Sequence, residues 1–185
     1  MHPLLPWLAR RPLRHLHAVG AFLGWVAYLG SPSYRRRLRS NAALAGVSPA
    51  ARRASVGEAG KLLMELPRLW LRPAGVAIND PVRWEGAEFV QQALTAGKGL
   101  VLLTPHLGSF EVAAQAYAER FGEQQPISVL YRPARQAWLR ELEETARARP
   151  HLATAPANLA GVRQLMRALR QGQTLGMLPD QVPPH

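Results

Sequence analysis

A histidine and a glutamate stand five residues apart directly after an apolar run, and side chains of these types can act together in proton transfer. The run that begins at Gly99 has the composition of a short buried strand, and residues 110–120 have that of a helix. His106 is therefore expected in the turn between them, and Glu111 in the first helical turn. There an imidazole can take up a proton near neutral pH while the carboxylate fixes its tautomer. The alternatives are a histidine that only satisfies backbone groups and an acid favoured by the helix dipole.

Polar side chains also follow two later apolar segments. Arg132 comes directly after one of them, and Asp180 and Gln181 follow another. Because ligands of open α/β sheets bind outside the carboxyl ends of the strands, we expect these side chains to meet His106 at one edge. The planar fork of Arg132 suits a phosphate or carboxylate. Asp180 and Gln181 would orient a catalytic loop or bind substrate hydroxyls, and surface or turn roles are the alternative for all three.

From residue 99 onward, strand-like segments alternate with helical ones. The expected strands are 99–103, 126–131, 152–155 and 174–178, and the expected helices are 110–121, 134–149 and 159–171, the last starting at Asn158 and stopping at Gly172. This alternation is typical of βαβ units and predicts an α/β fold with a parallel sheet. Before it, the sequence predicts helices at 48–71 and 86–96 and a short strand at 80–84, with a kink or break expected at Pro67.

The N-terminal part of the chain combines an apolar segment with flanking arginines. Residues 16–30 are apolar apart from His17; arginines stand at positions 10, 11 and 14 before them and at 35, 36, 37 and 39 after them. Such bracketing is typical of a membrane-surface segment. A full span needs roughly 20 apolar residues, so a short or tilted membrane helix, an interfacial anchor and an ordinary buried helix remain open. We expect a membrane anchor at residues 1–40 and a catalytic domain at residues 41–185.

The composition restricts the classes of function. The 185 residues include no cysteine, which excludes disulfides, thiolate catalysis and cysteine-ligated zinc, and we expect no metal site. The net charge of +11 implies an anionic partner. Nucleic acid is not favoured, because no recognisable reading module is present. Arg163, Arg167 and Arg170 recur at helical spacing, a pattern that is usually a solvated face and that would also suit an acidic carrier protein.

Taken in order, these motifs resemble the bacterial lipid A late acyltransferases, the lauroyl and myristoyl transferases of lipopolysaccharide biosynthesis. The resemblance spans nearly the whole chain. It rests on the N-terminal apolar helix with the arginine-rich segment 34–41, on His106 and Glu111 with four residues between them, on Tyr131-Arg-Pro133, and on Gly176-Met-Leu-Pro-Asp-Gln181. It implies an αβα sandwich of the glycerolipid-acyltransferase type behind an N-terminal hydrophobic helix.

The resemblance also implies a reaction and a place for it. The reaction is transfer of a fatty acyl group from acyl carrier protein to a hydroxyl of a lipid A precursor, an anionic glycolipid, at the cytoplasmic face of the inner membrane. No metal or organic cofactor would be needed. His106 would be the general base supported by Glu111, and Arg132, Asp180 and Gln181 would bind substrate. Members of the family usually continue past the Pro-Asp-Gln block, so we expect the C-terminal part of the catalytic domain to be missing from this sequence.

A hydroxyl that attacks a thioester also requires donors for the oxyanion of the tetrahedral intermediate. We expect backbone N–H groups at 108–110, around Ser109, to supply them at the helix N-terminus. Two other functions remain open. One is acylation of phosphatidylinositol mannosides or another glycolipid, and the other is a non-catalytic membrane-peripheral protein that uses its arginines to hold anionic lipid and does not need His106.

Overall fold

The chain forms two compact units, Met1–Leu71 and Arg72–His185. The computed structural model describes residues 4–73, 75–78 and 82–180. The boundary between the units follows residue 71, because the long helix that follows residue 48 packs along the apolar N-terminal helix within the first unit. The membrane anchor at residues 1–40 and the catalytic domain at residues 41–185 stay predictions.

The first unit is entirely helical. It contains α1 (Leu4–Ala9), α2 (Leu13–Gly30), α3 (Pro32–Leu44) and α4 (Pro49–Trp70). Two serines set the starts of α3 and α4, since Ser31 Oγ accepts a hydrogen bond from the Tyr34 N–H and Ser48 Oγ accepts one from the Ala51 N–H. The predicted helix at 48–71 is confirmed, and of the kink or break expected at Pro67, the break does not occur. Helix α4 continues through this residue to Trp70.

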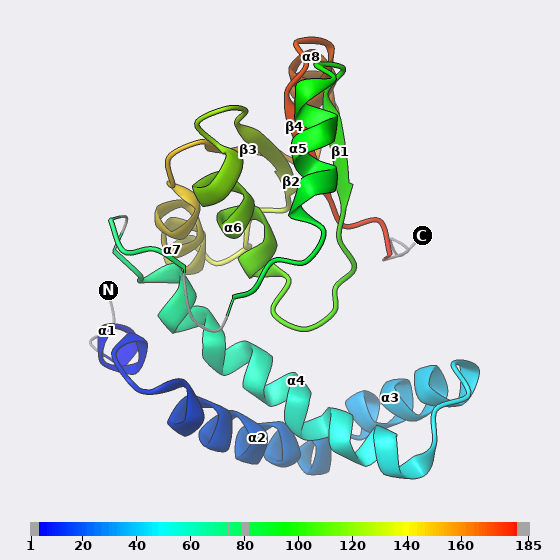
Figure 1. Cartoon of the computed structure of the whole chain (residues 1–185). Coiled ribbons are helices and arrows are strands. Elements are labelled where there is room, and N and C mark those ends of the chain that lie inside the picture. Colours follow the sequence, from blue (N-terminus) through cyan, green and yellow to red (C-terminus); the bar gives the residue numbers. More distant parts are fainter. Residues whose placement is uncertain (1–3, 74, 79–81, 181–185) are drawn as a thin grey trace. The chain divides into compact units, whose positions relative to one another are not determined.

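Helices α2 and α4 lie side by side at very short range (Figure 1). Glycines make this approach possible: a Cβ atom placed on Gly20 would stand 2.6 Å from the carbonyl oxygen of Gly60, and one placed on Gly24 would collide with the carbonyl of Val56. A polar contact lies on the same interface, where His17 Nε2 and Glu65 Oε1 are 2.7 Å apart. Gly20 and Gly24 thus serve packing against α4.

The other side of α2 carries large apolar side chains that remain exposed. Phe22 is 67% exposed and Leu29 is 64% exposed. The exposed set on this helix is Val19, Phe22, Leu23, Trp25, Val26 and Leu29. Among the described residues, no helix combines the length and apolarity that a membrane crossing requires.

The second unit confirms the predicted α/β fold. Its parallel sheet consists of β1 (Leu100–Leu103), β2 (Ile127–Tyr131), β3 (Leu152–Pro156) and β4 (Thr174–Met177), in the order β1-β4-β2-β3. The helices are α5 (Ala87–Thr95), α6 (Glu111–Phe121), α7 (Ala137–Arg147) and α8 (Leu159–Arg170). Of the strand expected at 80–84, residues 80 and 81 lie outside the described part, and residues 82–84 are not a strand.

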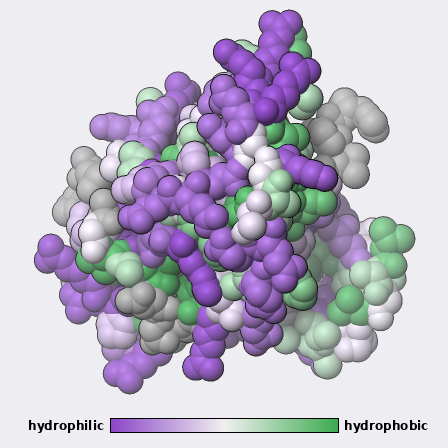
Figure 2. Space-filling view, turned by 45° about the horizontal axis from the view of Figure 1, so that its top comes forward, coloured by the Kyte–Doolittle hydropathy of each residue, from purple (hydrophilic) through white to green (hydrophobic). Residues whose placement is uncertain are grey.

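Each face of the sheet has its own apolar core. On one face, Tyr117 and Phe121 of α6 and Leu94 of α5 pack with Ile127 and Leu152. On the other face, α8 packs on the sheet, and this core consists of Ala155, Leu165, Ala168 and Leu175. The sheet is therefore covered on both sides, as expected for an αβα arrangement. Hydrophilic residues cover most of the molecular face shown in Figure 2, with hydrophobic patches between them.

Candidate active site

The site lies at the carboxyl ends of the two neighbouring strands β1 and β4. Leu103 is paired with Met177 at the end of these strands, and the Thr104 N–H donates to the Met177 carbonyl at 2.9 Å. The pairing therefore continues one residue past β1 before the two segments separate. It brings His106, three residues after β1, next to Asp180, three residues after β4.

The Asp180 carboxylate contacts His106 through both of its oxygens. Oδ2 accepts a hydrogen bond from the backbone N–H of His106 at 2.8 Å, and Oδ1 lies 2.8 Å from the ring nitrogen Nδ1. Phe110 packs against the imidazole, with the ring centroids 4.8 Å apart and the rings close to an edge-on arrangement. Two contacts, with Asp180 and Phe110, thus fix the orientation of the imidazole, and the third anchors the backbone that carries it.

This geometry determines which nitrogen of His106 can act as a base. An ionised carboxylate only accepts hydrogen bonds, so Nδ1 must carry the proton. Nε2 then holds the free lone pair, and within the described part of the chain it has no hydrogen-bond partner. The hydrogen bonds from the His106 ring and backbone lower the pKa of Asp180 below its ordinary value, which keeps this carboxylate ionised.

Glu111, which the sequence paired with His106, has a different partner. Its Oε1 lies 2.8 Å from Nη2 of Arg147, near the end of α7, and the two side chains are 17% and 16% exposed. The expectation that Glu111 fixes the tautomer of His106 does not match these contacts, since the carboxylate on Nδ1 belongs to Asp180. The physical reason is that a nearby guanidinium captures Glu111 in a largely buried pair.

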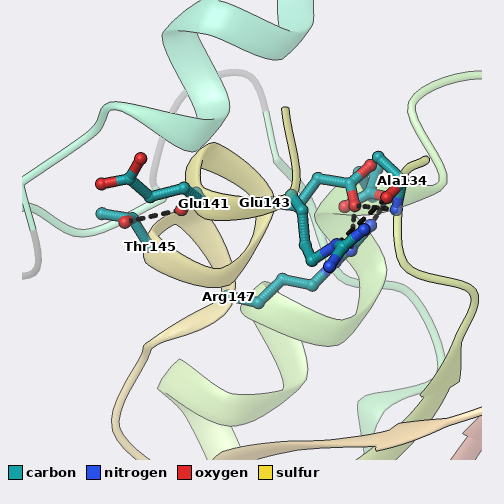
Figure 3. A network of polar contacts seen from close by, with 7 residues as sticks. Ala134, Glu141, Glu143, Thr145 and Arg147 are labelled. Carbon is teal, nitrogen blue, oxygen red and sulfur yellow. Dashed lines mark hydrogen bonds and ion pairs between the residues drawn. The ribbon is translucent and has the colours of Figure 1, made fainter. Parts of the chain in front are cut away.

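Arg147 links three segments around the loop after β2. Besides Glu111, it pairs with Glu143 at 3.7 Å, and its guanidinium lies over the ring of Tyr131 at 5.2 Å. Glu143 Oε2 in turn accepts a hydrogen bond from the backbone N–H of Ala134 at 3.2 Å. Figure 3 shows Glu143 between Arg147 and Ala134. This network, which we call the Arg147 network, ties the start of α6 and the loop after β2 to α7.

Sequence reasoning missed both Arg147 and Glu143. The available signal was their spacing, because an acid and a base four residues apart in a predicted helix form a pair on one face. Nothing in the sequence pointed to their contacts with Glu111 and the loop after β2.

The remaining predicted residues lie around this centre. Arg132 is exposed in the loop that the Arg147 network holds, and among the described residues it has no ion-pair partner. Ser109 is half-buried in the turn before α6. Gly108, with φ of +57°, and Ser109 have N–H groups without an acceptor in the described part of the chain, whereas the Phe110 N–H donates to the Gly108 carbonyl. Gln181 lies outside the described residues.

The arrangement offers a base and candidate oxyanion donors. Nε2 of His106 can accept a proton, and the unpartnered N–H groups of Gly108 and Ser109 in the same turn can bind a developing negative charge. In the described ranges, no three side chains of histidine or acidic type gather in a way that would hold a metal ion.

Comparison with models of known protein families found a match. The family model of the bacterial lipid A biosynthesis acyltransferases matches residues 4–183, which takes in both compact units and every motif considered above. Among curated proteins, no match was found.

Proposed function

Because the chain belongs to the bacterial lipid A biosynthesis acyltransferase family, we propose that it transfers a fatty acyl group from acyl carrier protein to a hydroxyl of a lipid A precursor. Family membership indicates an acyltransferase of the lipid A type. The observation that supports a catalytic centre is the contact between His106 Nδ1 and Asp180, because it leaves Nε2 of the ring as a base.

In the proposed reaction, Nε2 of His106 removes the proton from the acceptor hydroxyl as its oxygen attacks the thioester carbonyl carbon. The carbonyl electrons move onto oxygen, and the N–H groups of Gly108 and Ser109 stabilise that oxyanion. When the intermediate collapses, the carbon–sulfur bond breaks and the imidazolium returns the proton to the thiolate. Asp180 stabilises the imidazolium in between without taking its proton.

Glu111 and Arg132 support this reaction from the substrate side. Glu111 holds Arg147, and through the Arg147 network it positions the loop that carries Arg132. Arg132 then binds a phosphate of the acceptor through its planar fork of donors. Gln181 and Ser109 remain predicted substrate-binding residues.

We assign the first unit to the cytoplasmic surface of the inner membrane. The exposed apolar side chains of α2 include Phe22 and Trp25, and such amphipathic surfaces insert at the boundary of headgroups and acyl chains. Exposed arginines lie before this helix at 10 and 11, in its first turn at 14 and after it at 36, 37 and 39, and they suit anionic headgroups. This placement would hold the enzyme next to its lipid acceptor.

The test is transfer of a labelled lauroyl group from acyl carrier protein to a tetra-acylated lipid A precursor. We expect His106→Ala to lower the rate on the order of a hundredfold or more. His151→Asn serves as the matched control, because His151 is exposed at the amino end of β3 with φ of 62°, a conformation that asparagine tolerates. An unchanged rate in His106→Ala would contradict the proposed base.

The acceptor is tested in the same assay by offering a phosphatidylinositol mannoside in place of the lipid A precursor. Turnover with the mannoside alone would replace the proposed acceptor by another glycolipid. Binding of anionic lipid without any transfer, equally in wild type and His106→Ala, would favour the non-catalytic membrane-peripheral alternative.

A further inference from the structure

We propose that the exposed face of α8 is the docking surface for an acidic protein, which under the proposed function is the acyl carrier protein that delivers the donor. The inference rests on the proposed function only for the identity of this protein. The surface itself follows from the distribution of charged and apolar side chains along α8, from its position in the fold, and from the contrast with α2.

Two parallel ridges run along the solvent side of α8. Leu159, Val162 and Met166 form an apolar ridge and are 66%, 46% and 47% exposed. Arg163, Arg167 and Arg170 form a basic ridge beside it, since positions three and four residues apart lie on one face of a helix. The opposite side of the helix is engaged in the core through Leu165 and Ala168.

The positive charge of the basic ridge is not compensated. Helix α8 contains no acidic residue, and none of its three arginines has an ion-pair partner among the described residues. They are spread over about 10 Å of helix, given a rise of 1.5 Å per residue. Guanidinium groups bind carboxylates in a bidentate manner, so a row of acidic side chains on a partner helix would complement this ridge. An apolar ridge beside it supplies the surface that a stable contact buries.

The position of α8 also suits a donor-binding role. The helix begins at Leu159, three residues after the end of β3, with Asn158 as its N-cap through a 3.0 Å bond to the Gly161 N–H. Its N-terminal end therefore lies at the carboxyl edge of the sheet, the edge that carries His106. A carrier seated on α8 would hold its thioester arm at the same edge as the base.

An uncovered part of the sheet lies on the same side as α8. Leu175 of β4 is packed in the α8 core, and Val101 is its register partner on the edge strand β1. Neighbouring residues in a parallel pair point to the same face, so Val101 and Leu103 face the α8 side, yet both are exposed. These side chains give an apolar surface on the strand that leads to His106, where an acyl chain can lie.

A protein fits this surface better than a bilayer does. The exposed apolar side chains of α8 are three aliphatic or thioether groups without an aromatic residue, and arginines stand directly beside them. The exposed face of α2, in contrast, is broad and includes Phe22 and Trp25, as interfacial helices do. The chain thus has two different surfaces for two different anionic partners.

The experiment compares two charge reversals of equal size in the whole chain. The first is Arg163→Glu, Arg167→Glu and Arg170→Glu on α8, and the matched control is Arg36→Glu, Arg37→Glu and Arg39→Glu on α3, where the three arginines are likewise exposed. The readouts are affinity for purified lauroyl acyl carrier protein, affinity for vesicles of phosphatidylglycerol, and transfer kinetics with lauroyl carrier or lauroyl pantetheine as donor.

We expect the α8 variant to raise KM for the lauroyl carrier about tenfold or more, since reversing several interface charges weakens electrostatic association. With lauroyl pantetheine, which lacks the protein part, its kinetics should equal those of wild type. The α3 control should keep its carrier affinity. Met166→Glu, a second variant that leaves the arginines intact, should also weaken carrier binding.

Three outcomes would overturn the inference. Wild-type carrier affinity in the α8 variant would refute this surface, while carrier-dependent transfer by the same sample would leave the proposed function standing. If the α8 variant lost vesicle binding but kept its carrier affinity, the basic ridge would be assigned to membrane binding. If wild type bound no carrier yet transferred from pantetheine, both this docking surface and the proposed donor would be refuted, but acyl transfer would remain.

Discussion

The carboxylate of Asp180 holds the backbone N–H and the ring Nδ1 of His106 at 2.8 Å each. Both contacts act on one residue, so the carboxylate fixes the position of the loop and the tautomer of its imidazole together. The two residues that separate Asp180 from the end of β4 therefore do more than form a turn, because they place this carboxylate against the proposed base.

Asp180→Asn should remove the orienting charge while keeping the shape of the side chain. The amide can donate to Nδ1 and leave the proton on Nε2, which is the wrong tautomer for a base. We expect kcat to fall between about 10² and 10⁴-fold, by analogy with the loss of the aspartate in a serine hydrolase triad. Steady-state kinetics across pH would show it. An Asp180→Asn enzyme with wild-type kcat would exclude Asp180 from this role.

Asp180 should also contribute to the acid sensitivity of folding. Its hydrogen bonds to His106 lower its pKa in the folded state below the ordinary 3.8. A lowered folded-state pKa stabilises the protein above the unfolded value, and this contribution is lost as pH falls through the folded value. The difference in thermal stability between wild type and Asp180→Asn should therefore be full at pH 6, shrink as pH falls below 3.8, and vanish below the lowered folded-state pKa. A difference in thermal stability that stays the same at every pH would contradict this pKa-linked contribution.

The sequence predicted the elements of the second unit well, because each is short and bounded by clear signals. Helix α8 begins after Asn158 and ends before Gly172, whose φ of 76° matches a glycine stop. The sequence could not predict which carboxylate would reach His106. That depends on sheet order, since β4 lies between β1 and β2, and alternation of strands and helices does not specify order.

Local sequence spacing could not indicate the partner of Glu111 either. Glu111 and Arg147 are 36 residues apart, and only the packing of α7 brings the guanidinium to the start of α6. Pro67 shows the opposite case, because a residue that usually ends a helix lies inside α4. It lies in the last turn of α4, where Leu71 N–H still bonds to its carbonyl.

Glu111→Gln should show whether Glu111 supports the loop after β2 through Arg147 or takes part in catalysis itself. Breaking a fully buried ion pair costs about 3–5 kcal/mol, and an exposed one is worth about 0–1, so this mostly buried pair should cost about 2 kcal/mol. Adding Arg147→Gln should cost less than the sum of the single changes, as chemical denaturation in a double-mutant cycle would show. Activity should fall mainly through a higher KM for the lipid acceptor. A fall in kcat as large as that of Asp180→Asn would restore Glu111 to the catalytic pair.

Phe22→Asp should weaken attachment of the first unit to anionic vesicles. The change puts a carboxylate into the middle of the exposed apolar face of α2, where Phe22 contacts solvent and carries no core packing. We expect at least a tenfold loss of partitioning in a flotation assay, because the buried apolar area drives interfacial binding. Ala54→Asp, on an exposed small residue of α4, controls for added charge, since it leaves the apolar face of α2 intact. Equal partitioning of wild type and Phe22→Asp would refute this face as the membrane contact.

Gly60→Ala should loosen the first unit at the contact between α2 and α4. A Cβ atom there would collide with the carbonyl oxygen of Gly20, which is backbone and cannot rotate away. Overpacking of this kind costs about 1–3 kcal/mol or more. Gly30→Ala is the matched control, since a Cβ at Gly30 meets nothing within 4 Å and alanine favours helix. Amide hydrogen exchange should accelerate in α2 and α4 of Gly60→Ala and stay unchanged in α6, because the disturbed contact lies within the first unit. Exchange at the wild-type rate in both helices would show that they do not depend on this close approach.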